Sequence, residues 1–245
     1  MLLLFATLAA HAGVSAAHPA ARSARHEVPL GDARITLAEI DAGAGSLDVR
    51  GVPGLDKVQV TGTAWASNDA LLAQIDVQVT CRDDRVTIRT VIPDTNGREE
   101  AGVDLVVELP PRFSATIDDG SGDLSVTGIA GVDLDDGSGN AVLTDLSGPV
   151  RIDDGSGDLR IERVAGPVSV EDGSGDLRVR EVSGPVSVDD GSGDVDLAQI
   201  AGSVEVDDGS GDIALTDVQG AVVLHDGSGA RRITRVLGPV TVDED

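Results

Sequence analysis

The chain has 245 residues, of which 40% are hydrophobic but only 1% aromatic, with no tyrosine. Its core must therefore come from Val, Leu, Ile and Ala, which suits stacked thin strands better than a globular core built on large aromatic anchors. The formal net charge is −25, and residues 118–245 alone carry 28 acidic and 8 basic side chains. Such a surface repels nucleic acid and anionic lipid, which disfavours both as partners.

The chain begins with a short apolar run, residues 2–10, followed by small residues that permit cleavage after Ala12 or Ala17. This pattern predicts a secretory signal peptide over residues 1–17, although no Lys or Arg precedes the run. The run is too short to span a bilayer permanently, and no later segment predicts a membrane-spanning helix. We expect residues 18–29 to form a disordered leader of an exported protein, either periplasmic or secreted and associated with the cell surface.

Residues 30–117 carry an eroded form of a repeat that becomes regular further on, and they predict irregular N-terminal coils that cap the stack. Residues 35–60 resemble a first coil, residues 67–74 predict a short capped helix, and strands are expected around 75–79, 86–91 and 103–109. The single Cys81 excludes an intrachain disulfide. It is expected to be a small buried hydrophobe, with intermolecular pairing as the alternative.

Residues 118–245 hold seven copies of an acidic glycine turn of the form Asp-Asp-Gly-Ser-Gly-Asp. The first glycine of each copy falls at 120, 137, 155, 173, 191, 209 and 227, so the period is 17 residues once and then 18. A fixed period of this size is the signature of a solenoid. The sequence therefore predicts an all-β fold, a single parallel β-solenoid.

One repeat shows how a coil is built. Leu177 and Val179 alternate with arginines in one short strand, and Val186 and Val188 flank Ser187 in a second. Gly-containing turns on both sides complete an 18-residue coil, and coils stack at roughly 4.8 Å each. Right-handed winding is the default for such parallel crossovers. A left-handed hexapeptide helix would need apolar residues six apart, which the repeat does not supply.

The three acidic positions of each turn are not equivalent. The middle aspartate is the same in all seven copies, and its carboxylate is expected to accept hydrogen bonds from the glycine amides inside the turn. The outer positions vary and are expected to face solvent in two carboxylate columns. They give the only tentative metal ligands, namely Asp118, Asp123, Asp135, Asp153, Asp158, Glu171, Asp176, Asp189, Asp194, Asp207 and Asp212.

Stacked carboxylates repel one another and are stabilised by bridging cations, among which Ca²⁺ prefers oxygen-rich, flexible sites. The calcium-binding β-roll also has 18 residues per coil, but its Gly-Gly-x-Gly-x-Asp pattern is absent here. Calcium binding is therefore the alternative to a plain solvated acidic face, and no other cofactor is expected. His225 replaces the first aspartate of the last copy and is expected to be a surface variant.

The segment from Asp41 to Gly51, the irregular central strands and the repeated Gly-Ser-Gly-Asp turns resemble a bacterial adhesin-domain family of unknown function. The chain is similar to the head domain of auto-transporter adhesins over roughly residues 30–245. The resemblance implies an exported or envelope-associated β-solenoid without established catalytic residues. We expect a structural or interaction module with an envelope or extracellular partner, protein or glycan. A polysaccharide-active β-helix enzyme is the weaker alternative, because no catalytic constellation has credible spacing.

Overall fold

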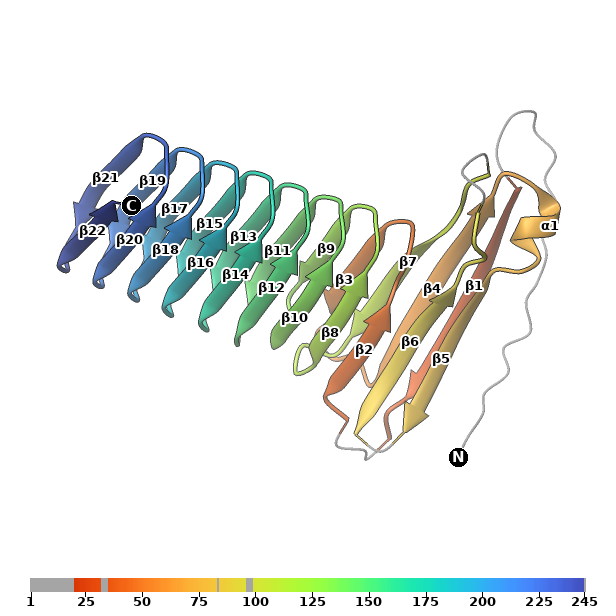
Figure 1. Ribbon diagram of the computed structural model, residues 1–245. Coiled ribbons are helices and arrows are strands. Elements are labelled where there is room, and N and C mark those ends of the chain that lie inside the picture. The colour runs from red at the N-terminus through yellow and green to blue at the C-terminus, as the bar shows by residue number, and fades with distance from the viewer. Residues whose placement is uncertain (1–19, 32–34, 83, 96–98, 245) are drawn as a thin grey trace.

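The computed structural model describes residues 20–31, 35–82, 84–95 and 99–244. Nearly all of them form a rod whose two walls are eleven-stranded sheets, with the longest strands near one end (Figure 1). The signal peptide predicted over residues 1–17 lies outside the described residues. The fold is the predicted parallel β-solenoid.

Each regular coil gives one strand to each sheet. In the first sheet these strands are β9 (Leu124–Thr127), β11 (Ala141–Leu146), β13 (Leu159–Val164), β15 (Leu177–Val182), β17 (Val195–Ile200), β19 (Ile213–Val218) and β21 (Arg231–Val236). In the second sheet they are β8 (Ser114–Asp119), β10 (Gly131–Asp136), β12 (Val150–Asp154), β14 (Val168–Asp172), β16 (Val186–Asp190), β18 (Val204–Asp208), β20 (Val222–Asp226) and β22 (Val240–Glu244).

Neighbouring regular strands are parallel and pair residues one coil apart. Leu177 lies opposite Val195 in the first sheet, and Val186 lies opposite Val204 in the second. Two strands per 18-residue coil were predicted, and both are confirmed. The register follows from the side-chain period of two, because a slip of one residue would turn every apolar side chain outward.

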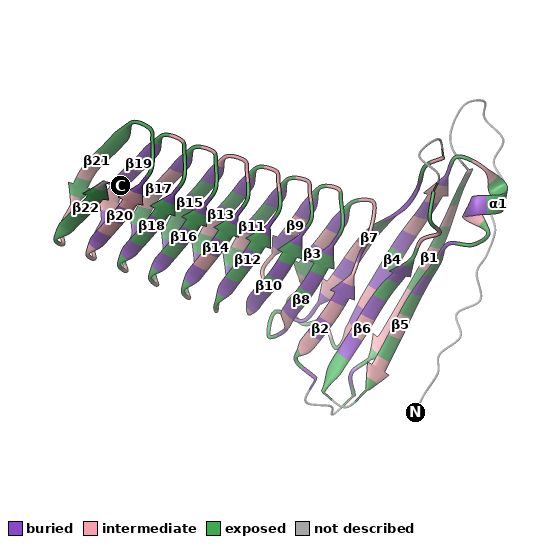
Figure 2. Ribbon diagram, viewed as in Figure 1, coloured by how far each residue is buried: buried purple, intermediate pink, exposed green. Residues whose placement is uncertain are grey.

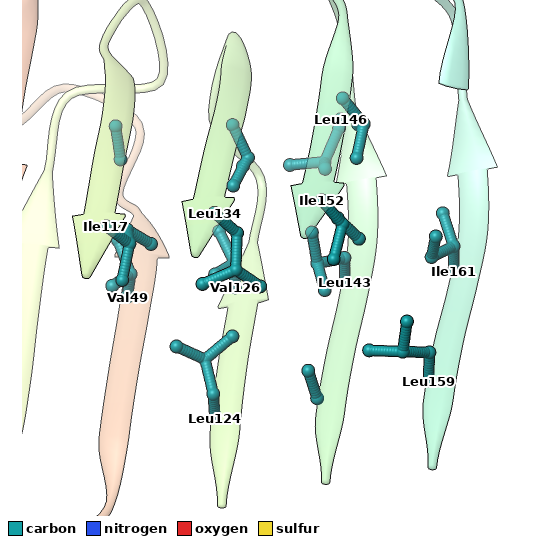
Figure 3. Packing of buried hydrophobic residues seen from close by; sticks show 14 of the residues in the cluster. Val49, Ile117, Leu124, Val126, Leu134, Leu143, Leu146, Ile152, Leu159 and Ile161 are labelled. Atoms are coloured by element: carbon teal, nitrogen blue, oxygen red, sulfur yellow. The ribbon is translucent and has the colours of Figure 1, made fainter. Parts of the chain in front are cut away.

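The core is a thin aliphatic layer between the two sheets. Inward side chains such as Val179, Val188 and Leu197 are buried along the rod as far as β20, while outward ones are exposed or half-buried, which gives the banded strands of Figure 2. Figure 3 shows the inner faces of successive coils meeting through Leu143, Ile152 and Ile161. Burying branched aliphatics against like neighbours in each coil is the main stabilising contribution.

The N-terminal part departs from chain order. It contains β2 (Leu37–Asp41), β3 (Leu47–Gly51), β4 (Lys57–Ala66), β5 (Asp76–Arg82), β6 (Arg85–Val91) and β7 (Ala101–Leu109). The β2–β3 coil lies between two later coils, because β2 pairs with both β6 and β8, and β3 pairs with both β7 and β9. The predicted irregular coils are thus the β2–β3 and β6–β7 pairs.

The outermost N-terminal strands are not coils. Strand β4 is antiparallel to β7, and β5 is antiparallel to β6, so both sheets change direction at this end. The predicted disordered leader over residues 18–29 is wrong for residues 20–29, which form strand β1 (Ala20–Pro29) antiparallel to β4. The ten-residue β4 offers a long backbone edge, and pairing with that edge orders a segment whose small and charged side chains gave little sign of a strand.

A short helix, α1 (Asp69–Leu72), follows β4, and the Asn68 side chain caps it by accepting a hydrogen bond from the Leu71 amide at 2.9 Å. This confirms the predicted capped helix, although it is shorter than expected. No helix among the described residues has the length and apolar character needed to cross a membrane. Cys81 is only partly buried at the margin of the core, and that burial raises the pKa of its thiol.

Candidate functional site

The acidic turns join each strand of the second sheet to the next strand of the first sheet. Their glycines are required by close contact between coils. Gly193 has φ +152°, and a Cβ on it would lie 1.7 Å from the Gly175 carbonyl oxygen one coil earlier. The Gly191 amide donates a hydrogen bond to the Asp172 carbonyl oxygen at 2.8 Å. The turns therefore stack backbone on backbone, which fixes their aspartates in three columns.

The inner column consists of the middle aspartates, all of which are buried: Asp119, Asp136, Asp154, Asp172, Asp190, Asp208 and Asp226. In Asp190 the Oδ1 atom accepts a hydrogen bond from the Ser192 amide at 3.0 Å, and four other members do the same with the serine two residues on. The role of the middle aspartate in building the turn was predicted, but the amide that donates to its carboxylate was expected to be that of glycine and is that of serine. The glycine amide bonds to the neighbouring coil instead.

The second carboxyl oxygen of Asp190 is buried without a hydrogen-bond partner, as in Asp136, Asp154, Asp172 and Asp208. Two unit charges one coil apart, about 4.8 Å, would repel by roughly 3.5 kcal/mol at an effective dielectric of about 20. Burial and then the charge of Asp154 raise the pKa of Asp172 to about 7. Burial likewise raises the pKa of Asp154 and of Asp208 to about 6. Asp154, Asp172 and Asp208 therefore keep a proton to a higher pH than an ordinary aspartate does.

The first-position column consists of the carboxylates just before the inner aspartates and is exposed: Asp118, Asp135, Asp153, Glu171, Asp189 and Asp207. Its members lie in register, with Asp189 opposite Glu171 on one side and Asp207 on the other. Glu171 accepts from Arg151 at 2.8 Å, and His225 continues the column 3.7 Å from Asp243. The inner column accepts hydrogen bonds from backbone amides of the turns, as the third-position column described next also does, whereas the first-position carboxylates are directed toward solvent and other side chains.

The third-position column consists of Asp123, Asn140, Asp158, Asp176, Asp194 and Asp212. These side chains link adjacent coils. The Asp212 amide donates to Oδ1 of Asp194 at 3.0 Å, and the Asp158 amide donates to Oδ1 of Asn140 at 3.1 Å. Because Asn140 serves as well as an aspartate, the column needs an oxygen acceptor and not a charge. This structural role was missed, although the Asn at position 140 was a signal for it.

The tentative metal ligands are thus divided between an exposed column and a hydrogen-bonded one. Among the residues that the structure describes, no group of three or more carboxylate, histidine or cysteine side chains is arranged to hold a metal ion. Calcium prefers six to eight oxygens around one point. Calcium binding stays a prediction without a geometric site.

The opposite side of each coil has a corner that the sequence reading did not anticipate. Near the end of each first-sheet strand from β11 to β21 one non-glycine residue takes a left-handed conformation, with φ between 55° and 61°: Asp145, Arg163, Glu181, Gln199, Asp217 and Arg235. The signal was present in the apolar spacing, because Leu177 and Val179 are two apart whereas the next buried residue, Val182, is three further on. One residue must therefore break the alternation.

These left-handed residues form the αL column, and all of them except Arg235 line a shallow groove of about 770 Å³ along the rod. Arg163 makes a two-point ion pair with Asp145, at 2.7 Å and 3.0 Å. Arg235 pairs with Asp217 in the same way. Glu181 and Gln199 occupy the two coils between these pairs. The column therefore presents a side chain of different charge at almost every step.

Two further pairs of opposite charge lie opposite each other between coils, Glu162 with Arg180 and Asp133 with Arg151. The two arginines form their ion pairs with other carboxylates, however. Arg180 reaches Asp196 at 2.7 Å and Arg151 reaches Glu171. Such exposed pairs contribute only a few tenths of a kcal/mol each.

The fold and these columns define a parallel β-solenoid that presents repeated carboxylates from tightly stacked glycine turns. The chain belongs to the Toastrack DUF4097 family, whose model matches residues 39–226. No curated protein matches it.

One solved structure shares the fold, and two further solved structures show a weaker similarity. A putative adhesin from Bacteroides fragilis is 12% identical, with a TM-score of 0.51 over 93% of this chain and 99% of that one. A putative cell adhesion protein from Clostridium sporogenes is 12% identical, with a TM-score of 0.39 over 93% of this chain and 100% of that one. A putative adhesin from Parabacteroides distasonis is 14% identical, with a TM-score of 0.40 over 91% of this chain and 97% of that one.

Proposed function

We propose that the chain is a non-enzymatic interaction module of the bacterial cell envelope, exported to the periplasm or the cell surface, that binds its partner through the first-position column. The observation that carries this proposal is the division of labour among the three columns. The inner aspartates build turns and the third-position side chains join coils, whereas the first-position carboxylates are exposed and in register.

A column with this spacing acts as one extended binding surface. Consecutive carboxylates lie about 4.8 Å apart, which is less than the screening length of about 8 Å at physiological salt, so their fields add. A partner with regularly repeated positive charges gains from several contacts at once, and its affinity exceeds that of any single contact. The partner we propose is therefore a protein or glycan with repeated cationic groups.

The solved structure that shares this fold is named as a putative adhesin, which supports a role in contact and adhesion. The rod suits that role, because each coil repeats the same surface at a fixed spacing. Adhesion by such a surface is expected to weaken at high salt, as for any binding between exposed charges.

The experiment compares two triple variants with the parent chain. Asp153→Asn, Asp189→Asn and Asp207→Asn together remove three of the six carboxylates of the first-position column. Binding to polylysine, measured by surface plasmon resonance at low salt, is expected to weaken about tenfold, because several contacts of one multivalent surface are lost together. Retention of a cationic partner from an envelope extract should fall in parallel.

The matched control removes the same number of charges from other outward positions, through Asp133→Asn, Asp196→Asn and Glu205→Gln. It should change polylysine affinity by less than about threefold. If both triple variants weaken binding equally, net charge and not the column is responsible, and the proposal fails.

A further inference from the structure

The last coil of the rod, formed by β21 and β22, has an exposed apolar face. Leu237 is 81% exposed, Val240 43% and Val242 37%, whereas Val222 and Leu224 in the preceding coil are 1% and 0% exposed. These three account for most of the large hydrophobic side chains that the described residues expose. The aliphatic core is thus uncovered at this end of the rod.

The backbone is uncovered at the same end. Strands β21 and β22 are the terminal strands of the first and second sheets, as Figure 1 shows. A terminal parallel strand presents a row of donors and acceptors to any further strand. At the other end of the rod the sheets close with antiparallel strands, β1 on one and β5 on the other.

The two edge strands carry opposite charges. Strand β21 contributes Arg231, Arg232 and Arg235, in a region where acidic residues greatly outnumber basic ones. Arg231 turns toward the inner column, where its Nε lies 3.1 Å from the Asp226 carboxylate, while Arg232 is exposed. Strand β22 carries the exposed Asp243. A basic edge beside an acidic edge is complementary to a second copy of itself.

We infer that two copies of this chain associate end to end through their last coils, with β21 of each copy pairing antiparallel with β22 of the other. A two-fold axis between the sheets, along the strands, produces this arrangement. Opposite residues in an antiparallel pair share a face, so inward residues must meet inward residues. A register with Ile233 opposite Val242 satisfies this rule and also places Arg232 opposite Asp243.

The alternative two-fold, which pairs β21 with β21, is disfavoured for two reasons. It would bring the arginines of the two copies together, which is repulsive. In addition, the second strand of a helical coil lies further along the rod than the first. When β21 of each copy faces β22 of the other, the two terminal strands on each side of the rod lie one strand spacing apart, so both pairs can form hydrogen bonds. When like strands face each other, only one pair comes this close and the other pair stays too far apart. The chosen arrangement covers Val240 and Val242 and pairs both backbone edges.

The test starts from the full chain, whose mass is measured by sedimentation equilibrium over a range of concentrations. A monomer–dimer equilibrium is expected. Arg232→Glu alone and Asp243→Arg alone each create like-charge contacts twice per dimer, and each should raise the dissociation constant about tenfold. The double variant Arg232→Glu with Asp243→Arg should restore dimerisation. Arg178→Glu, an outward charge reversal in the middle of the rod, is the control and should have no effect.

Disulfide trapping tests the register directly. Thr234 and Thr241 are opposite each other between copies in this register, but they lie on different sheets within one copy. Thr234→Cys with Thr241→Cys, in a Cys81→Ser background, should form a covalent dimer on oxidation, since opposite antiparallel residues have Cα atoms about 4.5–5.5 Å apart. The inference would be overturned by a monomer at all concentrations or by assemblies of more than two copies. It would also be overturned by a dimer that the double charge exchange does not restore and that does not form this disulfide.

Discussion

The two sides of each coil solve the same problem, reversal of the chain, with different chemistry. The acidic turn uses glycine where backbones touch, buries one carboxyl and repeats almost unchanged. The corner of the αL column places a non-glycine residue at positive φ, keeps that side chain at the surface and varies from coil to coil. Uniform residues therefore mark the side where packing decides the sequence, and variable residues mark the side that packing leaves free.

The largest expected difference comes from placing an alanine on each side of the coil. Gly193→Ala places a Cβ 1.7 Å from the Gly175 carbonyl oxygen, so the coils must separate at that point. We expect a loss of at least about 3 kcal/mol in unfolding free energy. Glu181→Ala at the αL column should cost less than about 1 kcal/mol, because it adds no contact. Urea denaturation measures both, and equal costs would contradict the comparison.

The next effect is the pH dependence that the acidic turns introduce. Burial raises the pKa of Asp172 to about 7, well above its unfolded value of 3.8. Between pH 4 and 7 the folded chain then holds a proton that the unfolded chain has released, so stability falls as pH rises and levels off above about 7. Each such carboxyl contributes up to about 1.4 kcal/mol per pH unit in that window. The melting temperature should be higher at pH 5 than at pH 8.

Asp172→Asn isolates this effect. The asparagine keeps an oxygen to accept from the Ser174 amide, now 3.0 Å from Asp172 Oδ1, and it carries no charge. We expect it to stabilise the rod at pH 8 and to flatten the pH profile. Asp145, whose pKa the Arg163 guanidinium lowers, is the control, since Asp145→Asn should leave the slope between pH 5 and 8 unchanged. A profile that rises with pH would show that the inner column is not protonated.

A smaller effect tests whether the third-position column acts through its hydrogen bonds or through its charge. Asp194→Ala removes the acceptor for the Asp212 amide and should cost about 1 kcal/mol. Asp194→Asn keeps the acceptor and should be nearly neutral, as Asn140 indicates. Thermal unfolding of the two variants at one pH decides the matter. Equal destabilisation by both would assign the role to charge and not to the hydrogen bond.

The smallest expected effect is a gain in stability from a glycine substitution in the αL column. Gln199 has φ +61°, a conformation that costs a side chain about 1–2 kcal/mol and glycine very little. Gln199→Gly should therefore stabilise the rod by about 0.5 kcal/mol after the greater entropy of the unfolded glycine is subtracted. Differential scanning calorimetry should show a slightly higher melting temperature. A decrease would mean that the Gln199 side chain stabilises the corner through its own contacts.

Local spacing made most of the rod predictable. The period of 18 gave the coils, and alternation around Val186 and Val188 gave the strands, because each coil contacts mainly its neighbours. The features that sequence reasoning missed depend on partners far away in the chain. Strand β1 exists because β4 offers it an edge, and the link from Asp194 to the Asp212 amide exists only once two coils have stacked. The three-residue step from Val179 to Val182 was visible, but only the structure shows that it requires the αL residue.

The order of the N-terminal coils determines where in the chain a coil can be added or removed. The β2–β3 coil contacts β6–β7 on one side and β8–β9 on the other, so residues 37–127 form a closed topological unit. Beyond it, the strands of every coil pair only with those of the coils immediately before and after it in the chain. An insertion or deletion of one 18-residue unit there leaves all other contacts intact, as in other linear repeat proteins. Gene duplication can therefore tune the reach of the rod, and with it the number of first-position carboxylates, one coil at a time.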